Sequence, residues 1–457
     1  MRQASKPHVS RSVFHFFVFF SIYFVFGIFL GSHSLTYPWF IDDLHQVRVF
    51  SLREILASWV GPFDPSGFET AGYRPILVLF NHFRAVLCGE SVVAHRIFGI
   101  ALFAAYLAVF LQIGRLSGLK LKQLILAGFL VLAAKNSWSH LVWILGAVRT
   151  FSGLLGALSC LMLLGSQGRK KKIIASIFIF GAAVLTREDL VAWAVFPILY
   201  HGYLESISSV DKNKDAVNQK KGSFLHLTVL VPVAAILLGL RGVFVPQADW
   251  RFEPGGWKIL FETCFYPMGQ TISYSFRFLW RVILLAVTLV ALINHPPQVK
   301  RRCVLWLLGC FLFTSMGLVN ARVDNLLVAT SFFALFWVDL IQALENLGAF
   351  GKFFSWTLTA GLILVSAWRN TQAQETMHPL SLDTLPLAAE FAFTEGLDIP
   401  SQRLEALRER FLNLGITNAE EADLKLTAYR ALAIRNRRFH PGTTRQPFLP
   451  KIGFHDY

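Results

Sequence analysis

Long apolar runs, separated by short polar stretches, dominate the chain from residue 13 onward. Most of these runs approach the ~17–25 residues that an α-helix needs to cross a bilayer, and repeated runs of this length favour spanning helices. The pattern therefore predicts an all-α multi-pass membrane protein with about eleven transmembrane helices. The predicted ranges are 13–30, 93–113, 121–135, 151–166, 173–186, 190–204, 224–244, 277–293, 303–319, 325–342 and 353–367.

The first and last apolar runs set the expected domain organisation. The run 13–30 is long enough to remain as a spanning helix, and no short apolar segment with an A-x-A cleavage site follows the N-terminus. We expect a multi-pass transmembrane domain over 1–367, with a long first outer loop at 31–92. Residues 368–457 then form a C-terminal helical region, with helix-like stretches such as SQRLEALRERFLNL but no 34-residue repeat.

Basic residues concentrate in alternate loops, which predicts the orientation of the chain. With the N-terminus in the cytoplasm of a plasma (inner) membrane protein, the basic loops all fall on the cytoplasmic side, and the C-terminal region lies outside. The opposite loops are poor in Lys and Arg. The residues expected on the cytoplasmic side are Arg2, Lys6, Arg11, Arg115, Lys120, Lys122, Arg169, Lys170, Lys171, Lys172, Lys212, Lys214, Lys220, Lys221, Lys300, Arg301 and Arg302.

Composition agrees with a membrane protein and excludes two other classes. Of the 457 residues, 54% are hydrophobic and only 16% charged, whereas soluble domains carry about 25% charged residues. The net charge of +15 could indicate nucleic-acid binding, but its location in short loops indicates topology instead, so no nucleic-acid partner is expected. The five cysteines lack paired spacing, which argues against a disulfide framework or a zinc site.

The first outer loop contains two adjacent carboxylates, Asp42 and Asp43, within YPWFIDDLHQVR. Ionised carboxylates are costly in the bilayer core, so the pair must lie at the interface or in a wet cavity. Mutual repulsion raises the pKa of one of them unless cations compensate. The pair could be solvated acids at a helix end, or one of them could be a general base that takes a proton from an acceptor hydroxyl.

A short amphipathic helix is predicted directly after this pair. SLRE at 51–54 has the form of a capping box. The helix that it begins would place Leu52, Ile55, Leu56 and Trp59 on one side, as in a helix that lies on the membrane surface.

Arg74, in GYRP, is held beside a proline and followed by an apolar stretch. Its guanidinium could extend to lipid headgroups, or it could bind a phosphate or carboxylate through two parallel hydrogen bonds. Arg322, in NARVDN at 320–325, lies on the same predicted face.

The segment TRED at 186–189 joins two apolar runs on this face. Thr186 can cap the next helix, and Asp189 would favour a helix N-terminus. Neither role accounts for Arg187 and Glu188, which could form an ion pair or bind an anion. A carboxylate pair and several arginines on one face suit an anionic substrate.

Taken together, these segments resemble the GT-C superfamily of membrane glycosyltransferases. The nearest resemblance is to the transmembrane and tetratricopeptide-repeat O-mannosyltransferase family and its bacterial relatives. The matching segments are YPWFIDD, the amphipathic helix, YRPILVLFNHFRAVLCGESVVAHRIFGIAL from Tyr73, WILG at 143–146 and LTRE at 185–188. The resemblance covers roughly residues 37–200, and the order and spacing of the motifs carry it more than any single motif.

The sequence also departs from the family pattern. The acidic residue expected before WILG is absent from AKNSWSHLVW, where only His140 is nearby. Near Arg322, Val323 and Asn325 replace the family's tyrosines, and the absence of tetratricopeptide repeats removes the inference of a protein acceptor.

The resemblance implies a GT-C-like helix bundle that transfers a sugar from a polyprenyl-phosphate donor to an acceptor hydroxyl on the outer face, with inversion. The acceptor could be a lipid, a glycan or a protein. Asp42 or Asp43 would be the base, with Asp42 favoured as the first of the pair, and its neighbour would orient the acceptor or a divalent cation. No cofactor is required. The other implied site residues are Arg74, Arg187 and Arg322 for the donor phosphate, and Tyr73 and Glu188 for positioning.

A transporter or flippase for a lipid-linked anion is the main alternative. Such a protein could use the same arginines without chemistry. Transporters often show internal repeats and broken helices near the midplane, whereas here neither a repeat nor a matching pair of interrupted segments is found, and the acids cluster at one face.

Overall fold

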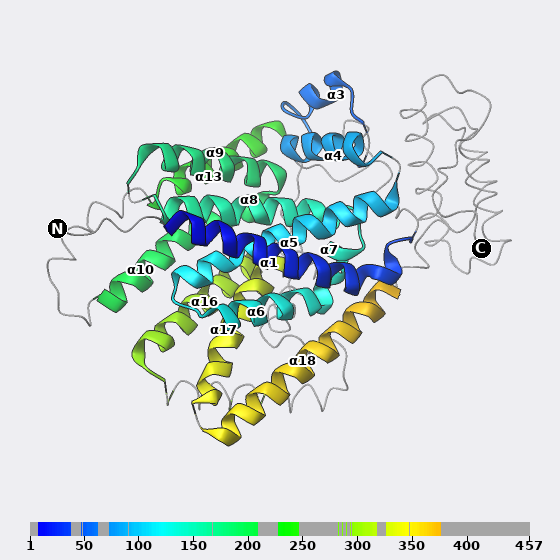
Figure 1. Cartoon of the computed structure of the whole chain (residues 1–457). Helices are drawn as coiled ribbons and strands as arrows, with labels where there is room; N and C mark the ends of the chain where they lie inside the picture. The colour runs from blue at the N-terminus through cyan, green and yellow to red at the C-terminus, as the bar shows by residue number, and fades with distance from the viewer. Residues whose placement is uncertain are drawn as a thin grey trace.

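The computed structural model describes residues 8–37, 47, 49–62, 73–89, 91–166, 168–208, 227–245, 282, 286, 289, 293, 295–317, 326–346 and 348–375. Within these residues the regular structure is helical, without a strand (Figure 1). The prediction of an all-α protein is confirmed. The predicted span at 277–293 lies outside the described residues except for four isolated positions.

Helices lie within each of the other ten predicted ranges, although they do not fill all of them. They are α1 (His8–Gly31), α5 (Val92–Leu116), α6 (Leu121–Ala133), α8 (Gly146–Leu164), α9 (Lys170–Thr186), the 3-10 helix η3 (Glu188–Ala194) with α10 (Phe196–Ser208), α13 (Leu230–Phe244), α16 (Pro297–Gly317), α17 (Leu327–Glu345) and α18 (Ala349–Glu375).

Fewer helices meet the requirements for crossing a bilayer than the sequence pattern predicts. Among the described residues, five stretches are long and apolar enough: Val13–Ser34, Val92–Leu116, Gly146–Leu164, Glu188–Ile207 and Leu327–Glu345. A bent pair, Leu121–Ala133 with Lys135–Leu141, raises the number to six. The fold is therefore that of an all-α membrane protein, and the count of eleven spans is not confirmed.

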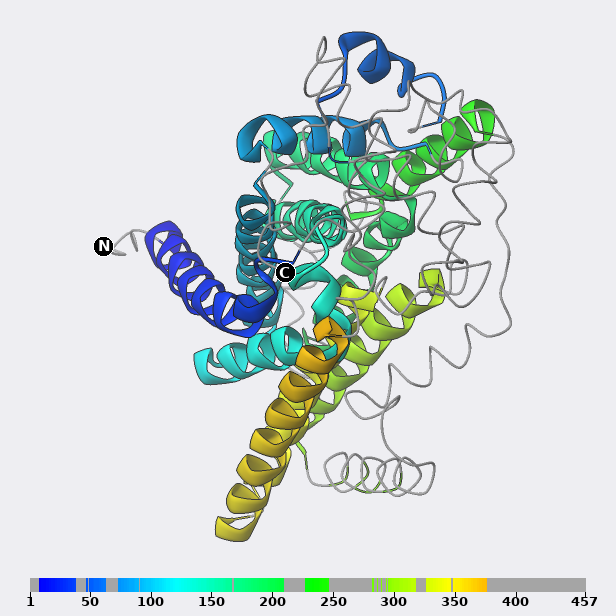
Figure 2. The same ribbon diagram turned by 90° about the vertical axis from the view of Figure 1, so that its right-hand side faces the viewer.

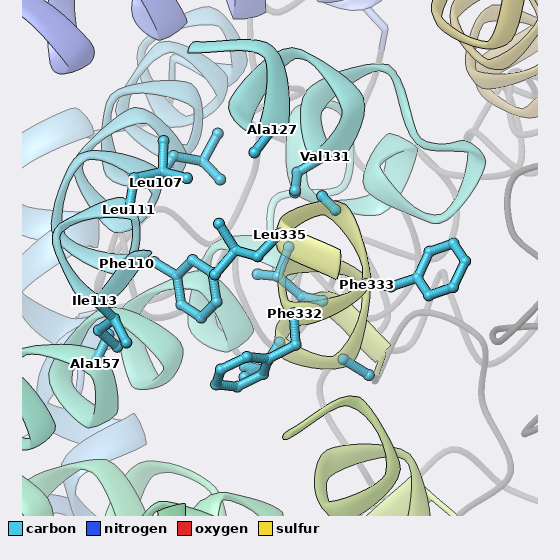
Figure 3. Close-up of a cluster of buried hydrophobic side chains, with 14 of the residues drawn as sticks. Leu107, Phe110, Leu111, Ile113, Ala127, Val131, Ala157, Phe332, Phe333 and Leu335 are labelled. Carbon is cyan, nitrogen blue, oxygen red and sulfur yellow. The ribbon is translucent and has the colours of Figure 1, made fainter. Parts of the chain in front are cut away.

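The centre of the bundle is α17, in which almost every side chain is buried. Phe332 lies at the middle of an aromatic cluster, with its ring centroid 4.9 Å from that of Phe110 on α5 and 4.6 Å from that of Phe196 on α10. Figure 3 shows Phe332 and Leu335 facing residues of α5, while Phe333 points away from them. On α16, a Cβ at Gly309 would lie 2.8 Å from the Phe332 ring, so a glycine lets the two helices approach.

A sharp break follows α6. The chain bends by 69° between α6 and the segment formed by η2 (Lys135–Ser137) and α7 (Trp138–Leu141). Backbone groups freed by such a break need new partners, because unsatisfied groups are costly in an apolar medium. Asn370 of α18 donates to the carbonyl oxygens of Leu132 and Ala134 at 3.3 and 2.7 Å, and the Ser137 hydroxyl donates to the Val131 carbonyl at 2.6 Å.

The end of α18 fastens to the end of α1 through Gln374. Its side-chain nitrogen donates to the Leu30 carbonyl at 3.3 Å, and its oxygen accepts from the Ser34 hydroxyl at 2.8 Å. Figure 1 shows α1 and α18 ending on the same side of the bundle.

Two short helices precede α5, namely α3 (Leu52–Ala57) and α4 (Pro75–Cys88). The capping box is confirmed: the Ser51 hydroxyl accepts from the Glu54 amide, and the Glu54 carboxylate accepts from the Ser51 amide. Leu52 and Leu56 are 71% and 59% exposed, as expected for an apolar face directed toward lipid.

Loops predicted to share one side of the membrane meet at one end of the bundle. The Arg302 guanidinium donates to the Ser117 carbonyl at 3.1 Å, and Lys122 forms an ion pair with Glu345 at 3.1 Å. α8 and α9 lie side by side with the chain reversed between them, since Ser159 of α8 and Ser176 of α9 are hydrogen-bonded with their hydroxyl oxygens 2.9 Å apart.

Candidate functional site

Arg74 forms a two-pronged ion pair with Glu188. Its Nε and Nη2 donate to the two carboxylate oxygens of Glu188 at 2.9 and 3.0 Å. Pro75 is the first residue of α4 and disfavours a helical conformation at the residue before it, so Arg74, with φ −139° and ψ 58°, lies outside the helix at its N-cap position. The pair joins residues separated by 114 positions.

A second arginine reaches the same carboxylate. Arg241 Nη2, in the last turn of α13, lies 3.3 Å from Glu188 Oε1. Glu188 begins η3, so an acid stands at a helix start and a cation at a helix end, as helix dipoles favour. We call Arg74, Glu188 and Arg241 the arginine–glutamate cluster. The side chains of Arg74 and Glu188 are 23% and 15% exposed, so solvent reaches this part of the cluster, whereas Arg241 is largely buried.

Tyr73 connects the cluster to its surroundings. Its hydroxyl donates to the Trp59 carbonyl at 3.0 Å, and its ring stacks on Phe244 with centroids 5.3 Å apart. Burial raises the pKa of the Tyr73 hydroxyl above its ordinary value, because the charged form is poorly solvated there. Tyr73 thus fixes the backbone next to Arg74 against the ends of α3 and α13.

The remaining charges of the TRED segment pair with each other. Arg187 Nε and Nη2 donate to the two oxygens of Asp189 at 2.9 and 3.1 Å. The predicted capping role of Thr186 is not observed: Thr186 is the last residue of α9, its hydroxyl donates to the Ala182 carbonyl, and Arg187 occupies the N-cap position of η3. A threonine at the end of one helix bonds back into that helix in preference to capping the next.

Four of the predicted site residues, Tyr73, Arg74, Arg187 and Glu188, therefore lie within the described structure. They belong to two ion pairs, Arg74–Glu188 and Arg187–Asp189, which are joined by the peptide bond between Arg187 and Glu188. Tyr73 precedes Arg74 in the chain and is held by its hydrogen bond to Trp59. Asp42, Asp43 and Arg322 lie outside the described residues.

The described residues on either side of the Asp42–Asp43 interval are both anchored. Arg96, buried at the start of α5, donates to the carbonyl oxygens of Leu35 and Tyr37, and to that of Val142 at 2.8 Å. Beyond the interval, the Phe50 amide donates to His82 Nδ1 of α4 at 3.0 Å.

The arginine–glutamate cluster has the chemistry of an anion-binding site. Each guanidinium is a planar group with five N–H donors. This planar geometry matches the oxygens of a phosphate as well as those of a carboxylate, so Arg74 and Arg241 have the chemistry to bind a phosphate. Among the described residues, no group of three or more His, Cys, Asp or Glu side chains could hold a metal ion.

Arg241 and Arg96 were missed at the level of sequence, although each carried a signal. Arg241 is a lone cation in the apolar run LVPVAAILLGLRGVF, and an ionisable residue in such a run indicates a partner or a function by default. Arg96 follows His95 near the start of α5, where it could pass for a residue at the membrane interface.

The fold and these contacts define a class: an all-α membrane protein with a charged, arginine-rich cluster where several apolar helices end. Comparison with known proteins does not assign the chain to a family within this class, since no protein-family model and no curated protein matches it.

Proposed function

We propose that the protein is a membrane glycosyltransferase that moves a sugar from a polyprenyl-phosphate donor to an acceptor hydroxyl, with inversion at the anomeric carbon. The observation that supports it most directly is the convergence of Arg74 and Arg241 on Glu188. Such a cluster can hold a phosphate at the edge of an apolar bundle, where a lipid carrier would present it.

The proposed chemistry needs one base and a stabilised leaving group. Asp42, or its neighbour Asp43, takes the proton from the acceptor hydroxyl, and the oxygen attacks the anomeric carbon from the face opposite the phosphate. The bond between that carbon and the phosphate oxygen breaks, and polyprenyl phosphate leaves with the electron pair. Arg74, Arg187 and Arg322 are proposed to stabilise that charge.

Glu188 and Tyr73 act as positioning residues in this proposal. Glu188 orients the Arg74 guanidinium by accepting two hydrogen bonds, and Tyr73 fixes the adjoining backbone through Trp59. No cofactor is required, and a divalent cation beside the aspartates is compatible with the chemistry.

The proposed setting is a plasma (inner) membrane with the N-terminus in the cytoplasm and the site on the outer face. The support is the distribution of basic loops and the meeting of two of them, at Ser117 and Arg302. These loops lie near the start of α1, since Arg115 Nη1 is 2.9 Å from His15 Nδ1.

A transporter for a lipid-linked anion is the second candidate. The break between α6 and α7 favours it to some extent, because transporters often place discontinuous helices at the substrate site. The carbonyl oxygens of Leu132 and Ala134 at this break accept hydrogen bonds from Asn370, and this weakens the case for a transported ion bound to those carbonyl groups.

Replacement of the proposed base separates the two functions. We expect Asp42→Asn to lower transfer from a radiolabelled polyprenyl-phosphate sugar by about 10²–10⁴-fold in membranes, with unchanged expression. Asp43→Asn is the matched control and should have a smaller effect.

Wild-type transfer in both variants would contradict the assignment of the base. If the wild-type protein instead moves labelled lipid across vesicles without forming product, the transporter function holds and the glycosyltransferase proposal fails.

A further inference from the structure

Two tryptophans and an arginine come together between the break after α6 and the start of α8. Trp138 begins α7, Trp143 lies in the connection, and Arg149 is in the first turn of α8. The two indole rings are nearly parallel, at 14°, with centroids 6.5 Å apart. The guanidinium carbon of Arg149 lies 4.9 Å from the centroid of the Trp143 ring. All three side chains are half-buried. We call them the indole platform.

The backbone around the indole platform is held tightly. A Cβ at Gly146 would overlap the carbonyl oxygen of Ser139, so only glycine lets α7 and α8 approach this closely. The His140 ring lies within hydrogen-bonding distance of the Thr150 hydroxyl, at 3.0 Å, and of the Gly146 carbonyl, at 3.2 Å. The platform therefore sits on a preformed turn.

The position of α7 argues against a role in the aromatic belt of a membrane protein. Belt tryptophans contact lipid headgroups from the perimeter of a bundle. The α7 segment instead contacts α1, α5, α8 and α18, and Figure 2 shows it (teal) near the middle of the view with helices around it. Trp356 and Trp368 of α18, each 53% exposed, are the perimeter type.

The indole platform also lies close to the described segment that ends at Tyr37, a few residues before the proposed base Asp42. One guanidinium, that of Arg96, binds both the Val142 carbonyl, next to Trp143, and the Tyr37 carbonyl.

We propose that the indole platform binds the pyranose ring of the acceptor, so that the acceptor is a glycan or glycolipid rather than a protein side chain. This rests on the proposed function for its place in the reaction. The faces of aromatic rings carry partial negative charge, and they attract the weakly positive C–H groups on one face of a pyranose.

Binding can be tested without transfer. The probes are methyl α-D-mannopyranoside, methyl β-D-glucopyranoside and methyl β-D-galactopyranoside, added to the full chain in lipid nanodiscs prepared without sugar detergents. Saturation-transfer NMR should show magnetisation on ring C–H protons for at least one probe. Trp143→Ala and Trp138→Ala should each weaken binding by about 2- to 10-fold and lower that signal accordingly, since one lost aromatic contact is worth about 0.5–1.5 kcal/mol.

Trp368→Ala is the matched control, because Trp368 also has an arginine over its ring, with Arg369 at 4.4 Å, but lies on the exposed side of α18. It should retain the signal. Trp143→Phe keeps an aromatic face and should retain most of the saturation-transfer signal. This variant distinguishes loss of the aromatic contact from loss of folding in Trp143→Ala.

Three results would overturn the platform: no transfer of magnetisation to any probe in the wild type, a wild-type signal in both Trp→Ala variants, or an equal loss in Trp368→Ala. Failure of the proposed function is a separate outcome. If the signal depends on Trp143 but Asp42→Asn and Asp43→Asn retain full transfer, the carbohydrate site stands and the assignment of the base does not.

Discussion

The two main charged groups of the described bundle differ in how completely they are enclosed. In one, Asp339 of α17 is fully buried and accepts from Arg302, with Nε at 2.9 Å, and from Trp306 Nε1 at 2.9 Å. Arg302 also donates to the Ser117 carbonyl, so one ion pair connects α16, α17 and the turn after α5. In the arginine–glutamate cluster, two guanidinium groups share one carboxylate within reach of solvent.

The difference indicates different roles. Asp339 has one cation, several donors and no contact with solvent, which is the arrangement of a group that stabilises helix packing. The arginine–glutamate cluster has two cations around one carboxylate and is partly exposed at Arg74 and Glu188, so a ligand can reach it. A buried charge is costly unless paired, so the two groups should respond differently when one partner is removed.

The largest effect is expected at the enclosed pair. Asp339→Ala leaves the Arg302 guanidinium buried without its carboxylate and should lower the free energy of unfolding by about 3–5 kcal/mol, measured as thermal unfolding in nanodiscs. The double variant Arg302→Met with Asp339→Leu removes both charges and should recover most of this loss. If Asp339→Ala were as stable as the wild type, the structural role of the pair would be wrong.

A smaller and different effect is expected at Glu188. Glu188→Gln keeps the side-chain shape but removes the charge that orients Arg74 and Arg241. Sugar transfer should fall by about 10- to 100-fold, since hydrogen bonds to charged groups are worth about 1.5–3 kcal/mol. Thermal unfolding should change less than in Asp339→Ala. Glu345→Gln, which removes an ion pair with Lys122 outside the proposed site, is the control, and an equal loss of transfer there would deny Glu188 a distinct role.

Arg74→Lys tests the geometry of the cluster more finely. A lysine keeps the charge but cannot form two parallel hydrogen bonds, so the KM for the polyprenyl-phosphate donor should rise about tenfold. Arg187→Lys makes the same change in the neighbouring pair and should raise it less. An unchanged donor KM in Arg74→Lys and in Arg74→Ala would count against a phosphate role for Arg74.

The smallest effect is expected at Gly118, which helps to present the Ser117 carbonyl to Arg302. Its φ is +90°, and a Cβ there would lie 3.5 Å from Arg302 Nη1. Gly118→Ala should cost about 1 kcal/mol, because this conformation disfavours a side chain. Gly202→Ala, in helix α10 with no atom within 4 Å of the added Cβ, should be neutral or slightly stabilising. Equal thermal midpoints in the two variants would remove the strain argument.

Local features could be read from the sequence because they depend on nearby residues. The helical class, ten of the helical ranges and the capping box at Ser51 follow from apolar run length and from short-range hydrogen bonding. Helix length was less predictable. The range 121–135 was expected as one span, but α6 ends at Ala133 and bends, because Asn370, more than two hundred residues away in the chain, takes up the freed carbonyls.

Part of the candidate site was also visible in the sequence. Tyr73, Arg74, Arg187 and Glu188 stood out as polar residues at the ends of apolar runs, while Asp42, Asp43 and Arg322 remain predictions from sequence. The sequence did not predict which arginine forms an ion pair with which carboxylate. Arg187 adjoins Glu188 in the chain, yet Glu188 pairs with Arg74 and Arg241, and Arg187 with Asp189.

The sequence by itself determined that this chain forms apolar helices with polar ends, because hydrophobic run length and helix capping are local properties. The tertiary structure decided which of those ends meet, that Arg302 is buried against Asp339 rather than exposed in a basic loop, and that two arginines converge on Glu188. The physical reason is that ion pairing acts through space, at distances of about 3 Å, between segments whose separation along the chain carries no information about their contact.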